Sequence, residues 1–240
     1  MDIGMLPGML SLQIQSLNDY LPTSILTDAM ISYNLVHIIR TAGYPKAARL
    51  KRWLSRLLPY RHVQVTSGGW DAQYVNGRWN YLRQIDELAH YGVITSYCHY
   101  LKQAGTILDL GCGEGILQER LNSGNYSRYV GVDISSEAIQ RASHKQDERT
   151  VFVLADASSY NPDEQFDIVV FNECLYYFEN PLGIVRRYER FLREDGAFIV
   201  SMYVDEQNMR IWKMLEALYT AEDEVRVSNK SGVFVDYQSV

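Results

Sequence analysis

A chain of 240 residues in which 47% are hydrophobic can bury a packed core, and this excludes wholesale disorder. Its 23 basic and 29 acidic residues leave a formal charge of −6, so a generic nucleic-acid or membrane-surface binder is not indicated. The length suits one large domain, or one domain with an appendage.

The cysteines and histidines predict no metal centre. Cys98, Cys112 and Cys174 are far apart, and no C-x-x-C is present. The five histidines show no metal-binding spacing. We expect three reduced thiols, as is usual inside cells. No signal peptide is recognisable, and no run reaches the roughly 20 apolar residues of a membrane span. We therefore expect a cytoplasmic protein without stable membrane insertion.

Residues 1–80 are predicted to form a helical N-terminal cap or lid. Apolar residues at helical spacing predict a helix over residues 23–42. Lys46–Arg61 reads as an amphipathic helix with six basic residues and no acid. A cap helix with a solvated basic face is our preferred interpretation. An anionic membrane surface or an acidic carrier partner is the alternative.

The segment Ser67–Leu82 is predicted to be a loop or lid, because glycines and Asn76 supply turns. It also carries aromatic side chains, of which Trp70 and Tyr74 are candidates to contact a cationic ligand through their rings. A hydrophobic clasp between the cap and the core is an equal alternative. A helix over residues 83–103 follows.

Residues 107–115 read ILDLGCGEG, a buried-strand pattern that breaks into three glycines. Gly111, Gly113 and Gly115 allow a sharp turn and a close approach to a ligand. Ile116–Asn122 is helical in pattern, so the N–H groups at its start would face that ligand. Strand, glycine turn and helix together predict a nucleotide-type pocket.

The glycine spacing is G-x-G-x-G and differs from the dinucleotide fingerprint G-x-G-x-x-G. The Gly-Lys-Ser/Thr ending of a P-loop is absent from the sequence. Asp109 and Glu114 would repel a pyrophosphate, since like charges repel. The turn is therefore a better host for a ligand that carries positive charge.

Three further strands are predicted to end in polar side chains. Tyr129–Ser135 contains Asp133, whose carboxylate can accept both hydroxyls of a ribose. Val151–Ala157 contains Asp156, and Phe166–Asn172 leads into ECLYYF. The other predicted elements are helices over Ser135–His144, Pro181–Leu192 and residues 206–221, a strand over Ala197–Val204, and two strands within Val225–Val240.

With these motifs in this order, the chain resembles the class I S-adenosylmethionine (SAM) methyltransferases over roughly residues 80–240. The resemblance implies an α/β fold with a Rossmann-like, seven-stranded, mostly parallel sheet whose last strand is antiparallel. It also implies a SAM-binding domain over residues 81–240 and a hydrogen bond from the adenine amino group to Asp156. The predicted cofactor-binding residues are Asp109, Gly111, Gly113, Gly115, Asp133, Ile134, Asp156, Ala157, Asn172, Trp70 and Tyr74.

Candidate catalytic residues follow the fourth of these strands. Many relatives carry histidine here, whereas this chain reads LYYF, so a histidine base is not carried over. Glu173, flanked by Tyr176 and Tyr177, is either a base for a hydroxyl or an anchor for an ammonium group. A structural role, or contact with the amino group of SAM, is the alternative for Glu173.

We therefore predict methyl transfer from SAM to an oxygen or nitrogen of a small or carrier-linked metabolite, in small-molecule biosynthesis. The N-P-P-Y form of DNA amino-methylating enzymes is absent from the sequence, so nucleic acid is not expected as a partner. A different reaction on the same fold, such as cyclisation, and a non-catalytic partner protein are the alternatives. A homodimer is left open.

Overall fold

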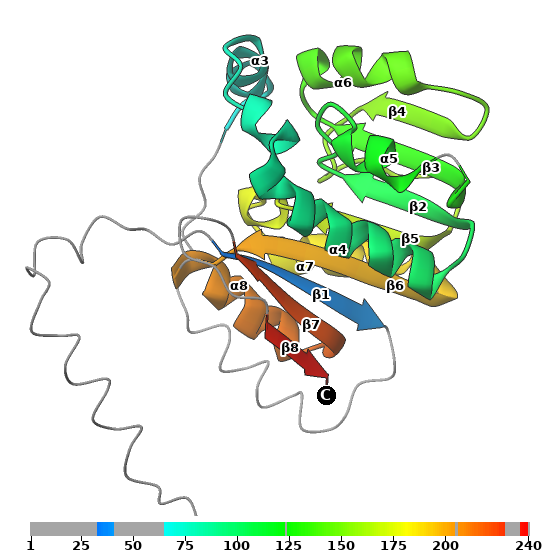
Figure 1. The fold of residues 1–240 in the computed structure, drawn as a ribbon, viewed down its shortest axis with the longest axis vertical. Helices are drawn as coiled ribbons and strands as arrows, with labels where there is room; N and C mark the ends of the chain where they lie inside the picture. The colour runs from blue at the N-terminus through cyan, green and yellow to red at the C-terminus, as the bar shows by residue number, and fades with distance from the viewer. Residues whose placement is uncertain (1–32, 41–64, 123, 205, 229–235, 240) are drawn as a thin grey trace, which may run out of the picture. The chain divides into compact units, whose positions relative to one another are not determined.

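A computed structural model describes residues 33–40, 65–122, 124–204, 206–228 and 236–239. They form one mixed sheet of eight strands in the order β4-β3-β2-β5-β6-β1-β7-β8 (Figure 1). The strands are β1 (Tyr33–Arg40), β2 (Gly105–Leu110), β3 (Tyr126–Asp133), β4 (Thr150–Leu154), β5 (Phe166–Asn172), β6 (Leu192–Tyr203), β7 (Thr220–Ser228) and β8 (Asp236–Ser239).

Five neighbouring strands, β4-β3-β2-β5-β6, pair in parallel, which confirms the predicted Rossmann-like α/β class. β7 and β8 pair antiparallel, as expected for the end of the chain. The predicted number of seven strands is wrong, because β1 lies between β6 and β7 and pairs antiparallel with both.

The helix predicted over residues 23–42 is also wrong where the structure describes it, since residues 33–40 are β1. The local sequence YNLVHIIR places apolar residues in adjacent pairs, which suit both the helical and the strand period. Its β-branched residues, Val36, Ile38 and Ile39, favour a strand. The segment forms a strand and not a helix because it pairs with both β6 and β7. The rest of the expected helix, and the basic segment Lys46–Arg61, lie outside the described residues.

The helices are α3 (Ser67–Val75), α4 (Ile85–Leu101), α5 (Ile116–Leu121), α6 (Ser136–Ala142), α7 (Pro181–Glu189) and α8 (Glu206–Glu216), with short 3₁₀ turns at Asn80–Arg83, Ser143–Lys145 and Leu175–Tyr177. The segment Ser67–Leu82 is therefore not a plain loop. Thr66 caps α3 by accepting a hydrogen bond from the Gly69 N–H, which starts a helix despite two glycines.

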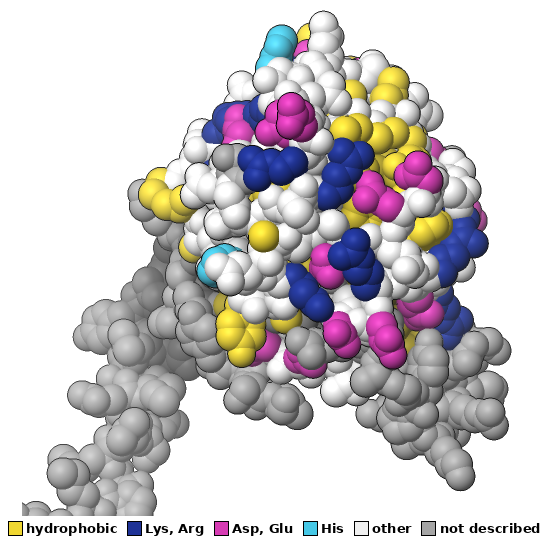
Figure 2. All heavy atoms as spheres, turned by 90° about the vertical axis from the view of Figure 1, so that its right-hand side faces the viewer, with side chains coloured by type: hydrophobic (Ala, Val, Ile, Leu, Met, Phe, Trp, Pro, Cys, Tyr) yellow, Lys and Arg dark blue, Asp and Glu magenta, His cyan; other side chains and the backbone are white. Residues whose placement is uncertain are grey.

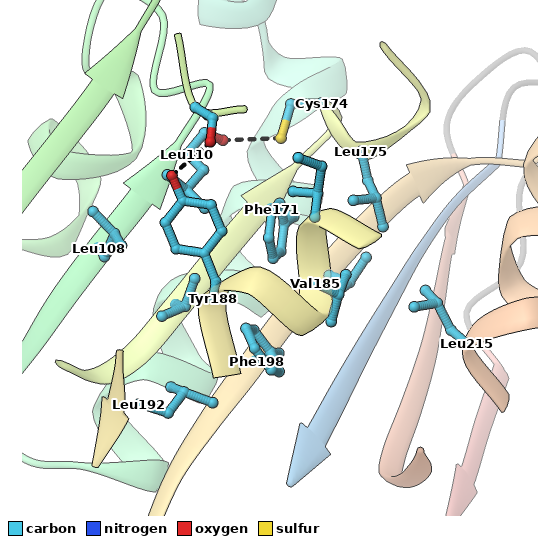
Figure 3. Close-up of a cluster of buried hydrophobic side chains, with 14 of the residues drawn as sticks. Leu108, Leu110, Phe171, Cys174, Leu175, Val185, Tyr188, Leu192, Phe198 and Leu215 are labelled. Carbon is cyan, nitrogen blue, oxygen red and sulfur yellow. Dashed lines mark hydrogen bonds between the residues drawn. The ribbon is translucent and has the colours of Figure 1, made fainter. Parts of the chain in front are cut away.

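Helices cover both faces of the sheet, which explains why its central strands are apolar without alternation. Ile107 and Ile168 face a cluster completed by α4 and α5. Leu108 and Phe171 face the opposite cluster, which includes Tyr188 of α7 (Figure 3). All six residues of β2 are buried, so the turn that follows it is anchored in the core.

On the face that Figure 2 shows, Lys and Arg side chains are interspersed with Asp and Glu side chains. This face therefore carries no large patch of one charge sign. In the described part of the chain, no helix has both the length and the apolar character needed to cross a membrane.

Candidate functional site

A cavity of about 720 Å³ lies where the carboxyl ends of the parallel strands meet. Its lining includes residues directly after β2 and β4 and the ends of β3 and β5. The chain leaves β2 toward β3 on one side, while β5 lies on the other. Ligands of open α/β sheets bind at such a switch point. The volume is within the range of small-molecule pockets.

The glycine turn approaches the lid segment closely. A Cβ on Gly113 would stand 2.6 Å from the Tyr74 hydroxyl oxygen, and Gly113 has a φ of +55°. Only glycine tolerates both conditions without strain. Gly111 also lines the cavity, but Gly115 is not among its lining residues. Gly115 instead begins α5 with a φ of +75°, and its backbone packs against the Phe152 ring.

Asp109 provides a buried carboxyl group in the cavity wall. Its Oδ2 accepts a hydrogen bond from the Tyr129 hydroxyl, whereas its Oδ1 is buried without a partner among the described residues. Burial raises the pKa of Asp109 to about 7, the Tyr129 hydrogen bond opposes this rise, and the charge of Asp133 adds to it. A cationic donor that reached Oδ1 would stabilise the ionised form.

Asp133 ends β3 and is held by backbone donors. Its two carboxylate oxygens accept from the Gly113 and Ser135 N–H groups, both at 2.8 Å. Burial raises its pKa, and these hydrogen bonds work against the rise. Each oxygen keeps a second lone pair for a hydroxyl of a ligand.

Glu114 contributes less negative charge to the turn than the sequence suggests. Arg83 contacts its carboxylate at 2.8 Å and Arg141 at 3.6 Å. The uncompensated acidic character of the turn therefore comes from Asp109 and Asp133.

The predicted residues at the far end of the cavity also lie together. Ile134, Asp156 and Ala157 line it. Asp156 is exposed, and one of its carboxylate oxygens accepts from the Ser158 N–H. The other oxygen has no described partner and is available to an amino group.

Aromatic rings from the lid segment form a connected group over the cavity. Trp70 meets Tyr177 edge-on at 4.7 Å between ring centroids, and Trp70 and Trp79 are 5.9 Å apart. Tyr176 and Tyr177 are 4.5 Å apart. All four rings, together with Tyr74, line the cavity. The lid therefore contacts the residues that follow β5.

A residue that the sequence did not single out fastens this lid. Asp71 of α3 accepts hydrogen bonds from the Ser135 and Ser136 hydroxyls and from the Glu137 N–H. These groups stand at the N-terminus of α6, where a carboxylate is favoured by the helix dipole. At the other end, Arg141 of α6 donates to the Tyr74 carbonyl.

Glu173 stands at the end of β5 in an unusual backbone conformation, with a φ of +53°. Such a conformation costs a non-glycine residue energy and occurs often at functional sites. Its Oε2 accepts from the Tyr203 N–H at 2.7 Å and from the Tyr176 hydroxyl at 3.2 Å. Burial raises the pKa of Glu173, and the charge of His90 opposes this effect.

His90 and Ser201 are functional candidates that sequence reasoning missed. His90 of α4 is 1% exposed and lines the cavity. Its Nδ1 is 3.3 Å from Glu87 Oε2, and its Nε2 is 3.0 Å from the Ser201 hydroxyl. The hydroxyl of Ser201 in turn lies 3.2 Å from Glu173 Oε1. A histidine is therefore present in the site, although it comes from a helix far upstream.

Comparison with known proteins decides the family. The family model of the methyltransferase domain matches residues 101–232, more than half of the chain. The chain belongs to this methyltransferase family. As a class I methyltransferase domain, it has SAM as its cofactor.

Two curated relatives are similar to this methyltransferase over part of its length. Malonyl-[acyl-carrier protein] O-methyltransferase 2 of Ilyobacter polytropus is 26% identical over 47% of this chain and 44% of that protein. The 27-O-demethylrifamycin SV methyltransferase of Amycolatopsis mediterranei is 32% identical over 40% of this chain and 38% of that protein. The chain thus matches less than half the length of each of these relatives.

A solved structure supports the fold of the methyltransferase. The N-methyltransferase NodS of Bradyrhizobium japonicum, in complex with S-adenosyl-L-homocysteine (SAH), aligns with a TM-score of 0.52 at 19% identity. The alignment covers 64% of this chain and 85% of NodS.

The cavity of the methyltransferase has groups that match the parts of SAM. Asp109 Oδ1 is an orphaned acceptor suited to an ammonium group. Asp133 has lone pairs for ribose hydroxyls, and the aromatic rings can contact a sulfonium. Trp79 adds a buried indole N–H without a partner among the described residues. The residues present therefore fit this cofactor.

Proposed function

We propose that the protein transfers the methyl group of SAM to an oxygen or nitrogen of a small or carrier-linked acceptor. The observation that carries this proposal is the position of the Glu173 carboxylate. Glu173 lines the same cavity as Asp109 and Asp133, and it directly follows β5, which is the neighbour of β2 in the sheet. When bound, SAM supplies an electrophilic methyl group on a sulfonium.

The acceptor is expected to bring a proton that must be removed. Glu173 keeps 20% of its side chain exposed, although it is held by Tyr203 and Tyr176. A carboxylate positioned in this way can take a proton from a hydroxyl or an amine. Its raised pKa makes it a stronger base than an exposed glutamate.

The charges around the cavity favour an acceptor without a carboxylate at the reacting end. Among the described lining residues there is no Lys or Arg, and eight carry carboxyl groups: Asp86, Glu87, Asp109, Glu114, Asp133, Asp156, Glu173 and Glu179. A carboxylate would meet these eight acidic groups with no Lys or Arg side chain to pair with, and His90 already lies between Glu87 and Glu173. A neutral hydroxyl or an amine is compatible with them.

The names of two relatives support including both small and carrier-linked acceptors in this proposal. One is named for a malonyl group on an acyl-carrier protein, the other for demethylrifamycin SV. The aromatic lid and the cavity volume suit an acceptor with an apolar body. Residues 81–240 remain our proposed SAM-binding domain, to which β1 contributes one strand of the sheet.

The proposal is tested by incubating the full chain with SAM and panels of phenols, amines and carrier-protein thioesters, and measuring mass shifts. Glu173→Gln should lower turnover by about 10²- to 10⁴-fold, the usual contribution of a positioned base. SAH affinity, measured by calorimetry, should be retained, because Glu173 acts on the acceptor.

Glu179→Gln is the matched control, since Glu179 is an exposed carboxylate that lines the same cavity. Its turnover should be close to that of the wild type. Equal turnover of wild type and Glu173→Gln would remove Glu173 as the base. A wild-type protein that binds no SAH would contradict the function itself.

A further inference from the structure

The hydroxyl of Ser201 stands between Glu173 and His90. Ser201 lies on β6 and is fully buried. Its Oγ is 3.0 Å from His90 Nε2 and 3.2 Å from Glu173 Oε1. The direct distance from His90 Nε2 to Glu173 Oε1 is 3.8 Å, which is too long for a hydrogen bond. The two titratable groups are therefore joined through one hydroxyl.

The hydrogen bonds around this hydroxyl allow two arrangements that connect Glu173 to His90. A serine hydroxyl donates one hydrogen bond and accepts two. Ser201 Oγ already accepts from the Glu173 N–H at 3.2 Å. Its own proton can go to His90 Nε2, to Glu173 Oε1, or to Asn172 Oδ1 at 2.8 Å. A protonated Glu173 can donate to Ser201 while Ser201 donates to His90. An ionised Glu173 can instead accept from Ser201 while His90 donates to Ser201.

These two arrangements differ only by the transfer of one proton from Glu173 to His90 through the hydroxyl. The other ring nitrogen of His90 faces Glu87 Oε2, which has no hydrogen to donate when Glu87 is ionised, so Nδ1 carries the hydrogen in both arrangements. Among the described side chains, Glu87 of α4 and Glu173 after β5 are the charged groups that face this imidazole, and the Tyr91 ring lies 5.2 Å away.

We propose that Ser201 and His90 form a proton relay that restores Glu173 after methyl transfer. This inference rests on the proposed function, and it assigns Ser201 and His90 as positioning residues that act through Glu173. The acceptor class it requires is one with a removable proton, a hydroxyl or an amine.

The relay balances in protons and electrons. As the lone pair of the acceptor forms its bond to the methyl carbon, the carbon–sulfur bond of the donor breaks and its electron pair stays on sulfur. Glu173 takes the proton of the acceptor. Ser201 takes that proton from Glu173 Oε1 and gives its own to His90 Nε2, which leaves Glu173 ionised. The imidazolium lies between two carboxylates, and Glu87, 12% exposed and lining the cavity, connects it to water.

A direct test needs no acceptor. In the full chain with ¹⁵N-labelled histidine, the ring nitrogen shifts of His90 report which nitrogen carries the proton in the neutral ring. His90→Gln identifies its signals. The relay requires Nε2 to be bare in the neutral ring and Nδ1 to be protonated. A neutral ring protonated at Nε2 could not take a proton from Ser201 and would overturn the proposal. Exposed His99 on the same helix is the internal reference, whose signals should not respond to Glu173→Gln.

Turnover provides a second readout that a packing role would not reproduce. Ser201→Ala should lower kcat by about 10- to 100-fold, less than the loss expected for Glu173 itself. Ser201→Thr keeps the hydroxyl and should recover most of the activity. If Ser201 acted only by packing, the larger threonine would be worse than alanine at this buried position. SAH affinity should be equal in all three proteins, and its loss in the wild type would contradict the proposed function rather than the relay.

Discussion

At the scale of single residues, we expect Asp109 to make cofactor affinity depend on pH. Its pKa is raised from 3.8 to about 7, so the group is neutral below pH 7 and ionised above it. An ionised Asp109 attracts an ammonium group more strongly than a neutral one. We expect SAH affinity to increase as the pH rises from about 6 to 8.

The stability of the unliganded protein should change in the opposite direction. A raised pKa in the folded state contributes stability that is fully present below the unfolded pKa and lost as the pH rises through the folded pKa. Between the unfolded value of 3.8 and about 7, the unliganded Tm should therefore fall, while the increase in Tm caused by SAH grows above pH 6. Thermal-shift series with and without SAH measure both trends, and Asp109→Asn should flatten them. A wild-type SAH shift independent of pH would contradict the assignment.

That Gly111, Asp133 and Asp156 line one cavity was predictable, because each ends or follows a strand in a short motif. Asp133 ends β3 and Asp156 lies two residues after the end of β4, and neighbouring parallel strands bring such ends to one edge of the sheet. His90 had no comparable signal. It is separated from Glu173 by many residues, and its only local feature is a place on a helix. The pairing arises from the packing of α4 against the sheet, which a single sequence does not encode in a readable motif.

At the scale of elements, the contact between α3 and α6 fixes the aromatic lid. Asp71→Ala removes three hydrogen bonds at the N-terminus of α6. We expect weaker SAH binding, with faster hydrogen exchange in α3 and an almost unchanged Tm. The reason is that α3 contributes one buried residue, Tyr74, and its loosening leaves the core intact.

A matched control is Asp147→Ala. Asp147 is an exposed carboxylate that also caps backbone N–H groups, those of Arg149 and Thr150, but it makes no hydrogen bond with α3 in the described part of the chain. Its loss should leave SAH affinity at the wild-type value. Equal effects of the two substitutions on SAH affinity would mean that the α3 contact does not hold the lid. Hydrogen bonds lower the pKa of Asp71, so the contact should persist at neutral pH and weaken only in acid.

Most elements from α4 onward lie close to their predicted positions, because strong apolar periods and local caps agree there. Ser135, for example, caps α6 by accepting a hydrogen bond from the Ala138 N–H. Residues 33–40 differ from their prediction. The pattern of β1 fits two periods, and only pairing with β6 and β7 selects the strand. To predict this strand, one would need to know that the sheet has a place for it between β6 and β7.

At the scale of the whole sheet, β1 joins the parallel part to the terminal hairpin. It pairs with β6 from Asn34 to Arg40 and with β7 from Tyr33 to Arg40, so β6 and β7 have no described ladder with each other. The β7–β8 hairpin is therefore connected to the parallel strands through β1. A segment distant in sequence completes the sheet.

Val36→Pro tests this connection. Proline removes a backbone N–H from a strand that is paired on both sides, and a lost buried hydrogen bond costs about 1–3 kcal/mol. We expect a lower free energy of unfolding in urea and faster amide exchange in β7 than in β2. Val36→Ile keeps the N–H and should behave like the wild type. Unchanged exchange in β7 would mean that β1 does not hold the hairpin in solution.

The left-handed backbone of Glu173 has opposite consequences for the stability of the fold and for the proposed activity. Glycine would occupy a φ of +53° without strain, whereas glutamate costs of the order of 1–3 kcal/mol there. Improvement of the fold alone would thus remove the carboxylate that we propose as the base. With Glu173 as the proposed base, selection for turnover would favour glutamate at position 173, whereas selection for thermal stability would favour glycine. Stabilised versions of this protein should be built elsewhere in the chain, with position 173 held fixed.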